Sequence, residues 1–458
     1  MGIYAREMDA IADDWRRACT GAAVAWRAMS LAWKASLYAV AVWLGVCKAS
    51  RAVAALGPLA IKLAQAATAR PDLFASGLVD ALRSLQDSVP PEPIRDLPEG
   101  AQLLASGSVA QVYACRTGST RQRSHVASSC SATIGDDNHG ECHDHGGVGC
   151  GVNRDGCDLV FKMRRPSVAG RAEADRAIMT WFLRSALGRI LIARVCRQAL
   201  VADALDHLVT IADDGLVRHM DFGAEADNTK RMQAMFANDP CRTVFVPATV
   251  DSLCTSDCLV MERVDGVPIR CLDTPAARSA AAHLLARAVC RMVFEFGLVH
   301  GDVHEGNVLA VGDPRPDAPD TRLRLALLDM GVVHNVDAVQ RRMIALLVRV
   351  AMGIDPPDLL ATCVYCSSAS LHGRSKRATS YASFCAHVTR AVSAGRRGSD
   401  LGAFVTALAT ACADSGVVMD RDMVARIAPL VAADGIARAY MAPSLTVTAC
   451  MLCPQMFS

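Results

Sequence analysis

The sequence predicts an α+β protein with two lobes and a helical extension in front of them. Three observations support this prediction. The chain has 458 residues, more than one hydrophobic core usually supports. Short strand-like runs gather between about residues 100 and 265, and the pattern after residue 266 is mainly helical. With 48 Lys and Arg against 46 Asp and Glu, the net charge of +2 gives no reason to expect nucleic acid as a partner.

The predicted helical extension covers residues 1–98 and ends at the proline-rich residues 90–93. One helix is expected directly after Gly57 and another from Ser76. The apolar run at residues 35–47 is too short to span a bilayer. We expect a helix packed on the protein there, with a membrane-surface helix as the alternative.

Residues 99–265 are expected to form a small lobe of strands and helices, with helices over residues 171–237. The expected strands are two within residues 103–115, joined by a tight loop, and one each at 159–162, 244–246 and 258–262. The last two are expected to close the same small lobe. Residues 266–458 form the predicted helical lobe, with a long helix that Thr274 caps and that ends at Gly297.

A polar insertion at about residues 117–158 lacks any periodicity, so we expect a largely disordered loop within a hairpin. It contains side chains that could bind zinc. They are Cys130, His139, Cys142, His143, His145, Cys150 and Cys157. Their spacing matches no standard zinc site, so a disordered polar loop is favoured over a metal site.

The chain has 19 cysteines scattered along its length and acidic residues near its N-terminus, from Glu7 to Asp14. The acidic residues argue against a secretory signal. Scattered cysteines without such a signal are typical of free thiols in a reducing compartment.

The strongest chemical signal is the run from His300 to Asn307, followed by an Asp-x-Gly at Asp329. Phosphoryl transfer needs a carboxylate near the attacking hydroxyl and oxygen ligands that hold Mg²⁺ on the phosphates. Asp302 is the predicted catalytic base. Asn307 and Asp329 are the predicted Mg²⁺ ligands.

Upstream residues supply the other parts of an ATP site in the order that kinases use. Lys162 ends a strand and can reach the α- and β-phosphates, while Glu225 on a later helix can fix its ammonium by an ion pair. Glu262 and Val264 lie where the chain is expected to leave a strand and pass beside the adenine of ATP. The predicted phosphate-covering loop consists of Ala105, Ser106, Gly107 and Ser108.

Each of these signals has a plainer interpretation. Asp302 and His304 could belong to a polar loop with self-capping side chains, and Glu225 could be an exposed helix residue. A lone lysine on a strand is more often solvated than catalytic. The order of all six parts is hard to obtain by chance, so a kinase-like protein is the favoured interpretation.

Several segments resemble the UbiB/ADCK family of atypical protein-kinase-like proteins. The likeness spans about residues 50–350, and its N-terminal signature is one that ordinary protein kinases lack. The matching segments are residues 57–65, 70–73, 85–91, 104–112, 220–228 and 300–307. The resemblance implies a bilobal kinase-like fold that binds ATP with Mg²⁺. It further implies a role in coenzyme Q biosynthesis, a lipid or other small-molecule substrate, and membrane association through the N-terminal helices, in a mitochondrion, plastid or bacterial membrane.

The resemblance also implies regulation by the extension. In the family, the Lys and Gln at the positions of Lys62 and Gln65 fold over the cleft, and Asp221 belongs to an acidic pair that faces the lysine. This chain departs from the pattern at His219, which replaces the second acid, and at Glu305, which replaces a usual proline. Further departures are Ala64, the small-residue loop at residues 105–107, and Val303. We therefore expect weaker autoinhibition and an intact nucleotide site.

The favoured function is that of an ATP- and Mg²⁺-dependent phosphotransferase or ATPase. Two alternatives remain open at this point. One is a nucleotide-binding pseudokinase scaffold without turnover, and the other is a true protein kinase with relaxed autoinhibition. The presence of Asp302 favours an enzyme over a scaffold.

Overall fold

The computed structural model describes most of the chain, in two compact units. The described residues are 25–38, 41–42, 49–57, 60–61, 63–64, 91–94, 97–107, 109–116, 158–169, 172–195, 208–210, 221–237, 242–312, 323–371, 380–395 and 400–457. The first unit comprises the described parts of Met1–Glu92, Gly107–Val109 and Arg165–Val217. The second comprises those of Pro93–Ser106, Ala110–Arg164 and Arg218–Ser458.

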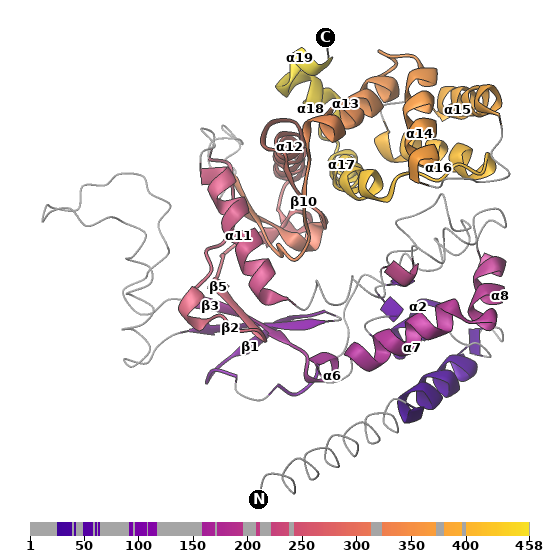
Figure 1. Ribbon diagram of the computed structural model, residues 1–458. Helices are drawn as coiled ribbons and strands as arrows, with labels where there is room; N and C mark the ends of the chain where they lie inside the picture. The colour runs from indigo at the N-terminus through magenta and orange to yellow at the C-terminus, as the bar shows by residue number, and fades with distance from the viewer. Residues whose placement is uncertain are drawn as a thin grey trace, which may run out of the picture. The chain divides into compact units, whose positions relative to one another are not determined.

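The first unit is helical (Figure 1). Its helices are residues 25–38, α2 (Ala49–Leu56), α6 (Pro166–Ala169), α7 (Ala172–Arg184) and α8 (Ala186–Val195). Arg27 joins the first of these to α7, because its guanidinium donates to both carboxylate oxygens of Asp175 at 2.7 and 2.9 Å. Gly57 has a φ of 110°, and its carbonyl accepts the Ile61 amide at 3.2 Å, where a helix was expected to start. The helix expected from Ser76 lies outside the described residues.

The second unit begins with a four-stranded antiparallel sheet in the order β1-β2-β3-β5. Its strands are β1 (Gln102–Ser106), β2 (Ala110–Arg116), β3 (Asp158–Arg164) and β5 (Cys258–Glu262). All four lie where the sequence predicted strands. The insertion between β2 and β3, with its cysteines and histidines, lies outside the described residues.

One strand expectation was wrong. The strand expected at residues 244–246 exists as β4 (Val244–Phe245), but it pairs in parallel with β9 and does not close the first sheet. The second sheet has the order β4-β9-β8-β6. Its other strands are β6 (Val267–Pro268), β8 (Val308–Val311) and β9 (Arg324–Leu327). A two-residue strand has too little alternation for the sequence to identify its partner.

Helix α11 (Phe222–Ala237) connects the small sheet to the helical lobe of the second unit. Near its start, Phe222 and Ala226 pack with Leu259 of β5 and Ala110 of β2. Towards its end, Met232 and Phe236 belong to the large hydrophobic core of the helical lobe. One continuous helix therefore packs into both cores, which fixes the orientation of the side chains between them.

Helix α12 (Pro275–Arg291) runs through the helical lobe and leads into the candidate site. Thr274 caps it as expected, accepting the Ala277 amide at 3.1 Å. A π-helical turn η6 (Met292–Phe296) follows, and Gly297 ends it with a φ of 71°. A Cβ at Gly297 would lie 2.9 Å from the Val336 carbonyl, so both the space and the backbone conformation require glycine there.

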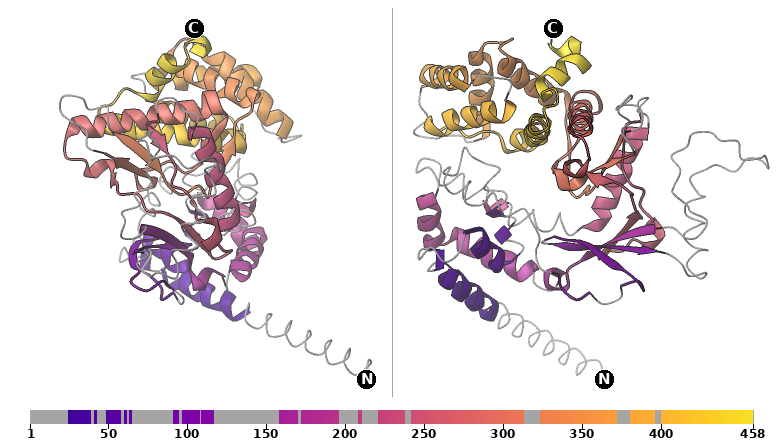
Figure 2. Two further views of the ribbon diagram at one scale, coloured as in Figure 1. Left: turned by 90° about the vertical axis from the view of Figure 1, so that its left-hand side faces the viewer. Right: turned by 180° about the vertical axis from the view of Figure 1, so that it is seen from behind.

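The remaining helices, drawn in orange to yellow in Figure 2, complete the helical lobe. They are α13 (Ala338–Met352), α14 (Pro357–Leu371), α15 (Tyr381–Gly395), α16 (Leu401–Asp414), α17 (Arg421–Ala439), α18 (Leu445–Leu452) and α19 (Pro454–Phe457). Helices α17 and α18 pack on α12, and α15 packs against α14 and α16. Asp434 of α17 is buried and accepts the first amides of two other helices, Leu401 of α16 at 3.0 Å and Leu445 of α18 at 2.9 Å. This arrangement confirms the predicted α+β fold with a helical C-lobe.

Two further features bear on the expectations. The cysteines within the described residues are free thiols. Among the helices that the structure describes, none combines the length and apolar character needed to cross a membrane.

Candidate active site

The candidate site is built where two pairs of strands meet. Strand β7 (Leu298–His300) pairs with β10 (Val333–Asn335), and β8 pairs with β9. Residues 301–307 run from β7 to β8, and residues 328–332 run from β9 to β10. Both segments therefore cross between the same two ladders, and this topology brings the Asp302 loop beside the Asp329 segment.

Backbone hydrogen bonds extend both ladders into these segments. The Gly301 amide donates to the Val332 carbonyl at 2.8 Å, and the Leu328 amide donates to the Asn307 carbonyl at 2.9 Å. A Cβ at Gly301 would lie 2.4 Å from Val332 Cγ1. This close approach explains the glycine directly before Asp302.

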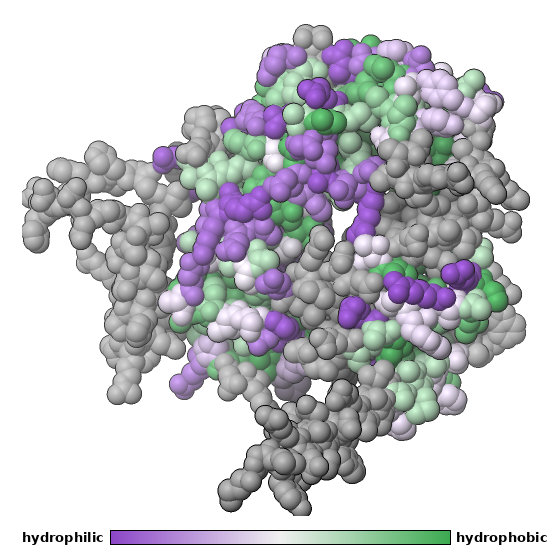
Figure 3. All heavy atoms as spheres, in the orientation of Figure 1, coloured by the Kyte–Doolittle hydropathy of each residue, from purple (hydrophilic) through white to green (hydrophobic). Residues whose placement is uncertain are grey.

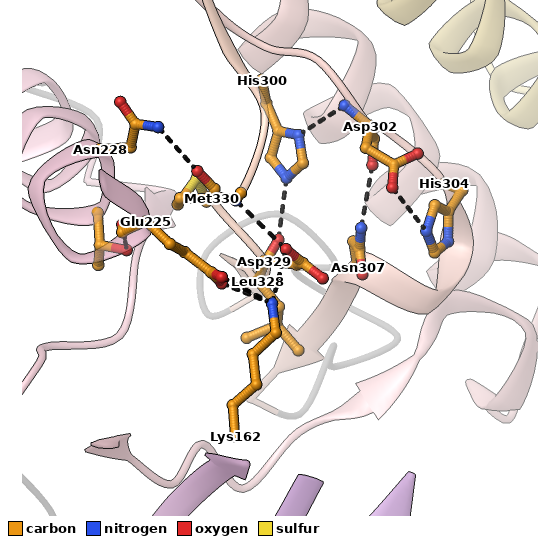
Figure 4. Close-up of polar contacts among 12 residues, drawn as sticks. Lys162, Glu225, Asn228, His300, Asp302, His304, Asn307, Leu328, Asp329 and Met330 are labelled. Atoms are coloured by element: carbon orange, nitrogen blue, oxygen red, sulfur yellow. Dashed lines mark hydrogen bonds and ion pairs between the residues drawn. The ribbon is translucent and has the colours of Figure 1, made fainter. Parts of the chain in front are cut away.

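His300 fastens the two segments together (Figure 4). Its Nδ1 accepts the Asp302 amide at 3.0 Å, and its Nε2 lies 2.9 Å from the Leu328 carbonyl. Only the neutral ring with the proton on Nε2 satisfies both contacts. The ring is buried, and this burial lowers the pKa of His300 below its usual value. The sequence prediction contained His300 in the motif but gave it no role.

The side chains of Asn307 and His304 orient the Asp302 loop. Asn307 Nδ2 donates to the Asp302 carbonyl at 3.1 Å, which directs the amide oxygen of Asn307 the other way. His304 Nδ1 accepts the Gly306 amide at 3.0 Å, and its Nε2 lies 3.7 Å from Asp302 Oδ2. The Asp302 carboxylate itself is exposed. It is therefore open to a hydroxyl that approaches from solvent.

Asp329 has an unusual backbone conformation. Its φ of 59° lies in the left-handed region, which residues other than glycine seldom adopt, although Asp tolerates it better than most. Its Oδ1 accepts the Gly331 amide at 3.3 Å. Asn228 of α11 donates to the carbonyl of Met330 at 3.1 Å, so a hydrogen bond from this helix restrains the residue that follows Asp329. A strained conformation retained in this way is common at functional sites.

Lys162 joins three elements of the second unit. Its Nζ lies 2.7 and 2.9 Å from the two carboxylate oxygens of Glu225 and 2.9 Å from Asp329 Oδ1 (Figure 4). The exposed fractions of the side chains are 14% for Lys162, 3% for Glu225 and 43% for Asp329. A strand, a helix and a loop thus meet at one ammonium group, and only Asp329 faces solvent to a large extent.

The charges of this triad are unequal, since two carboxylates share one ammonium. Burial raises the pKa of Glu225 to about 7, and nearby Asp329 adds to this while Lys162 opposes it. Burial by itself would lower the pKa of Lys162 and raise the pKa of Asp329. The attraction between these two charges outweighs burial, so the pKa of Lys162 is raised, with a contribution from Glu225, and the pKa of Asp329 is lowered. Asp329 therefore stays ionised, and it is the carboxylate of this triad that a cation from solvent could reach.

The predicted nucleotide-contacting residues occupy connected positions. Ala105 and Ser106 end β1, opposite Val112 and Gln111 of β2, and Val112 in turn pairs with Lys162 of β3. Gly107 is exposed, and Ser108 lies outside the described residues. The small-residue loop therefore begins at the end of β1, and β2 lies between β1 and the strand that carries Lys162.

The predicted adenine-side residues lie at the end of β5. Glu262 pairs with Leu159 of β3, and burial raises the pKa of its carboxyl group. The Glu262 amide also donates to the Ala248 carbonyl at 2.9 Å. Val264 follows in the connection from β5 to β6. This connection joins the first sheet to the second, and the adenine contact expected at these residues stays a prediction.

Glu305 is tied to the helical lobe. Tyr440, at the end of α17, donates its hydroxyl to Glu305 Oε1 at 2.7 Å, and Arg270 lies 3.9 Å from Glu305 Oε2. Glu305 begins the short turn η7 (Glu305–Asn307) that carries Asn307. The residue that departs from the family pattern therefore anchors the turn of a predicted metal ligand.

Of the predicted regulatory residues, only Asp221 lies within the described part of the chain. It is exposed, and its carboxylate accepts the Ala224 amide at 3.0 Å, which caps α11. Lys62, Gln65 and His219 lie outside the described residues, so the expected contact with Lys62 stays a prediction.

The donor set suits Mg²⁺ bound together with a nucleotide. Asp329 offers a carboxylate, and Asn307 offers an amide oxygen turned away from its own hydrogen bond. Mg²⁺ prefers such oxygen ligands and is commonly held by one or two of them together with substrate phosphates. Within the described residues, no group of three or more His, Cys, Asp or Glu side chains could hold a metal by itself.

Comparisons with known proteins show which proteins the chain resembles. Residues 146–358 match the model of the ABC1 atypical kinase-like domain. The Arabidopsis thaliana protein called ACTIVITY OF BC1 COMPLEX KINASE 1, chloroplastic, is 27% identical over 57% of this chain and 35% of its own length. A probable protein kinase UbiB from Cellvibrio japonicus is 26% identical over 62% of this chain and 47% of its own length.

A solved structure, the complex of Rv3197 with erythromycin from Mycobacterium tuberculosis, aligns over 78% of each chain. The TM-score is 0.43 and the identity 16%. The chain spans about half the length, or less, of the two curated relatives. Residues 146–358, which the family model matches, contain an atypical kinase-like domain. The family model and these relatives support the resemblance to the UbiB/ADCK family that the motifs indicated.

The hydrogen bonds of His300 lead to a prediction on pH. The pKa of His300 in the folded protein lies below the unfolded value of 6.5, so the unfolded chain binds the proton first as the pH falls. The contribution of His300 to stability is complete above 6.5 and is lost as the pH falls below it. We expect ¹⁵N NMR of histidine-labelled protein at about pH 6 to show a neutral ring with the proton on Nε2.

The His300 resonance can be assigned by its disappearance in His300→Gln. The same histidine in urea-unfolded protein serves as the control and should be mostly protonated at that pH. A ring that titrates alike in folded and unfolded protein would contradict the assigned hydrogen bonds.

Proposed function

We propose that this chain binds ATP with Mg²⁺ and transfers or hydrolyses the γ-phosphoryl group. The observation that carries the proposal is the ammonium of Lys162, held by buried Glu225 and shared with the solvent-facing carboxylate of Asp329. Such an ion pair positions an ammonium group for the α- and β-phosphates. The family model and the word kinase in the names of both relatives support the same reaction class.

The residues of the chain would divide the work as follows. Lys162 would bind the phosphates, while Asn307 and Asp329 would hold Mg²⁺, which neutralises charge on the phosphates when bound. Asp302 would accept the proton of the attacking hydroxyl or water, because its carboxylate is exposed and its backbone is fixed on both sides by His300 and Asn307.

The proposed substrate is a lipid or another hydrophobic small molecule, including those of the quinone pathway. This part of the proposal rests on the family resemblance. A pseudokinase scaffold and a true protein kinase are the alternatives that the experiment must separate.

Asp302→Asn should separate turnover from binding, because it removes the base but leaves the phosphate and metal ligands in place. We expect phosphate release from ATP to fall by about 100-fold or more, with nucleotide affinity unchanged. Asp358→Asn, an exposed carboxylate on α14, is the matched control and should behave like the wild type.

Equal phosphate release by Asp302→Asn and wild type would contradict the assigned base. Binding of ATP without any release by the wild type would favour the scaffold. Transfer of the phosphoryl group to a peptide in preference to water or a lipid would favour a protein kinase.

We further propose that the N-terminal helices contact a membrane surface. Trp26 and Trp33 are 73% and 68% exposed, and with Met29 and Leu37 they follow one face of the helix at residues 25–38. This helix has two basic residues and no acidic one. Further exposed apolar residues lie on α7 and α8, where Figure 3 shows apolar surface. Apolar and aromatic side chains on one face, with basic residues outside that face, are typical of helices that lie in a membrane interface.

The double variant Trp26→Ser/Trp33→Ser tests this contact by flotation with phosphatidylserine-containing vesicles. We expect most of the vesicle-bound protein to be lost, because the variant removes the two largest apolar side chains of the face. Met441→Ser, which removes an exposed apolar side chain from the second unit, should bind like the wild type. Undiminished flotation of the double variant would rule out this helix as the membrane contact.

A further inference from the structure

Helix α17 contacts both segments that carry the proposed Mg²⁺ ligands. It extends from Arg421 to Ala439, beyond residues 146–358 that match the family model. No residue of this helix has a role in the phosphoryl transfer proposed above. Each of the two segments nevertheless receives a hydrogen bond from the helix or from the residue that ends it.

The first contact comes from Tyr440, the residue that caps the end of α17. Its hydroxyl donates to Glu305 Oε1 at 2.7 Å, while Arg270 lies 3.9 Å from the other carboxylate oxygen. Burial raises the pKa of Tyr440 to about 12, and Glu305 adds to this, so the hydroxyl keeps its proton and stays a donor. A hydrogen bond to a charged group is stronger than one between neutral groups.

Tyr440 is itself held in place by the helical lobe. Its ring packs against the large hydrophobic core of that lobe. Helix α17 is fastened through buried Asp434, which accepts the first amides of α16 and α18. The hydroxyl of Tyr440 is therefore a fixed point that restrains Glu305.

The turn η7 depends on such a restraint, because it is only three residues long. His304 accepts the Gly306 amide through its side chain and the Asn307 amide through its carbonyl, both at 3.0 Å. A 3₁₀ turn of this length has few hydrogen bonds of its own, and their geometry is poorer than in an α-helix. The contact with Tyr440 joins the start of the turn to the helical lobe, and Asn307 stands at its end.

The second contact reaches the strand that follows the Asp329 segment. Arg426 of α17 donates from Nε to the Asn335 carbonyl at 2.7 Å. Asn335 is the last residue of β10, and its side chain accepts from Arg231 of α11 at 2.6 Å. Strand β10 is therefore fixed at its far end by two helices, and the Asp329 segment leads directly into it.

We propose that α17 positions the two Mg²⁺-binding segments through Tyr440 and Arg426, so that the affinity for Mg²⁺ depends on a helix beyond the residues that match the family model. This inference rests on the proposed ATP function, with Asn307 and Asp329 as the metal ligands. Tyr440 is a positioning residue that acts through Glu305 and is not itself a ligand. Mg²⁺ demands nearly ideal octahedral geometry, so a small displacement of one ligand weakens its binding.

The experiment measures the Mg²⁺ concentration that half-saturates ATP binding by the full-length protein. Tyr440→Phe keeps the packed ring and removes the hydroxyl. We expect this variant to need about tenfold more Mg²⁺, the lower end of what is lost with a residue that orients a metal ligand. Its affinity for ATP in EDTA should equal that of the wild type. A general loss of folding would weaken ATP binding under both conditions, and that result would overturn the proposal.

Two matched controls lie on α15. Tyr381→Phe makes the same chemical change where the hydroxyl lies 2.6 Å from that of Thr362. Arg390→Ala removes a guanidinium that donates to the Ala386 carbonyl of its own helix, and it is the control for Arg426→Ala. We expect both controls to show the Mg²⁺ dependence of the wild type and Arg426→Ala to need more Mg²⁺. An unchanged Mg²⁺ dependence in a test variant would overturn the role of the contact that it removes.

A double variant tests whether Tyr440 acts through Glu305. Glu305→Ala removes the acceptor of the hydrogen bond, so adding Tyr440→Phe to it should weaken Mg²⁺ binding no further. Two residues that act through one shared bond give effects that do not add. Additive effects of the two substitutions would overturn the proposed route from Tyr440 to the turn.

Hydrogen exchange without nucleotide separates this inference from the proposed function. We expect the Gly306 and Asn307 amides to exchange faster in Tyr440→Phe than in the wild type and in Tyr381→Phe. Unchanged exchange would overturn the hold of α17 on the turn, whatever the protein binds. If the wild type bound no ATP with Mg²⁺, the proposed function would fail, and the role of Tyr440 in Mg²⁺ binding would fail with it.

Discussion

The site depends on one shared ammonium group. Lys162 of β3 lies between Glu225 of α11 and Asp329, so the small sheet, the bridging helix and the segment after β9 meet at a single charge. Removing one partner of a buried ion pair lowers the stability of the folded protein far more than an exposed ion pair raises it. The three elements are therefore constrained together, and the constraint is electrostatic as well as steric.

The other contacts serve to bring Asp329 to this point. The paired ladders β7–β10 and β8–β9 set the two loops side by side, and His300 fastens them through the Asp302 amide and the Leu328 carbonyl. Asn228 holds Met330 from the same helix that carries Glu225. Helix α11 thus supports both the ion pair and the loop, and its packing in both cores keeps it in place.

Local patterns predicted much of this arrangement. The strands at residues 103–115, 159–162 and 258–262 and the cap at Thr274 all follow from short-range signals. The sequence did not reveal the partner of β4 or the role of His300. It also did not reveal the bond from Tyr440 to Glu305, which joins residues 135 positions apart. These features depend on pairing between distant segments, which leaves no periodicity in either segment.

The most direct test of the account is thermal stabilisation by ATP, measured with Mg²⁺ and with EDTA, in wild type and Asp329→Ala. Asp329 is an ionised carboxylate that faces solvent, and it is the proposed metal ligand. We therefore expect Mg²⁺-ATP to stabilise the wild type much more than ATP with EDTA does, and Asp329→Ala to lose this difference. Equal melting shifts in the two proteins with Mg²⁺-ATP would contradict the assigned site.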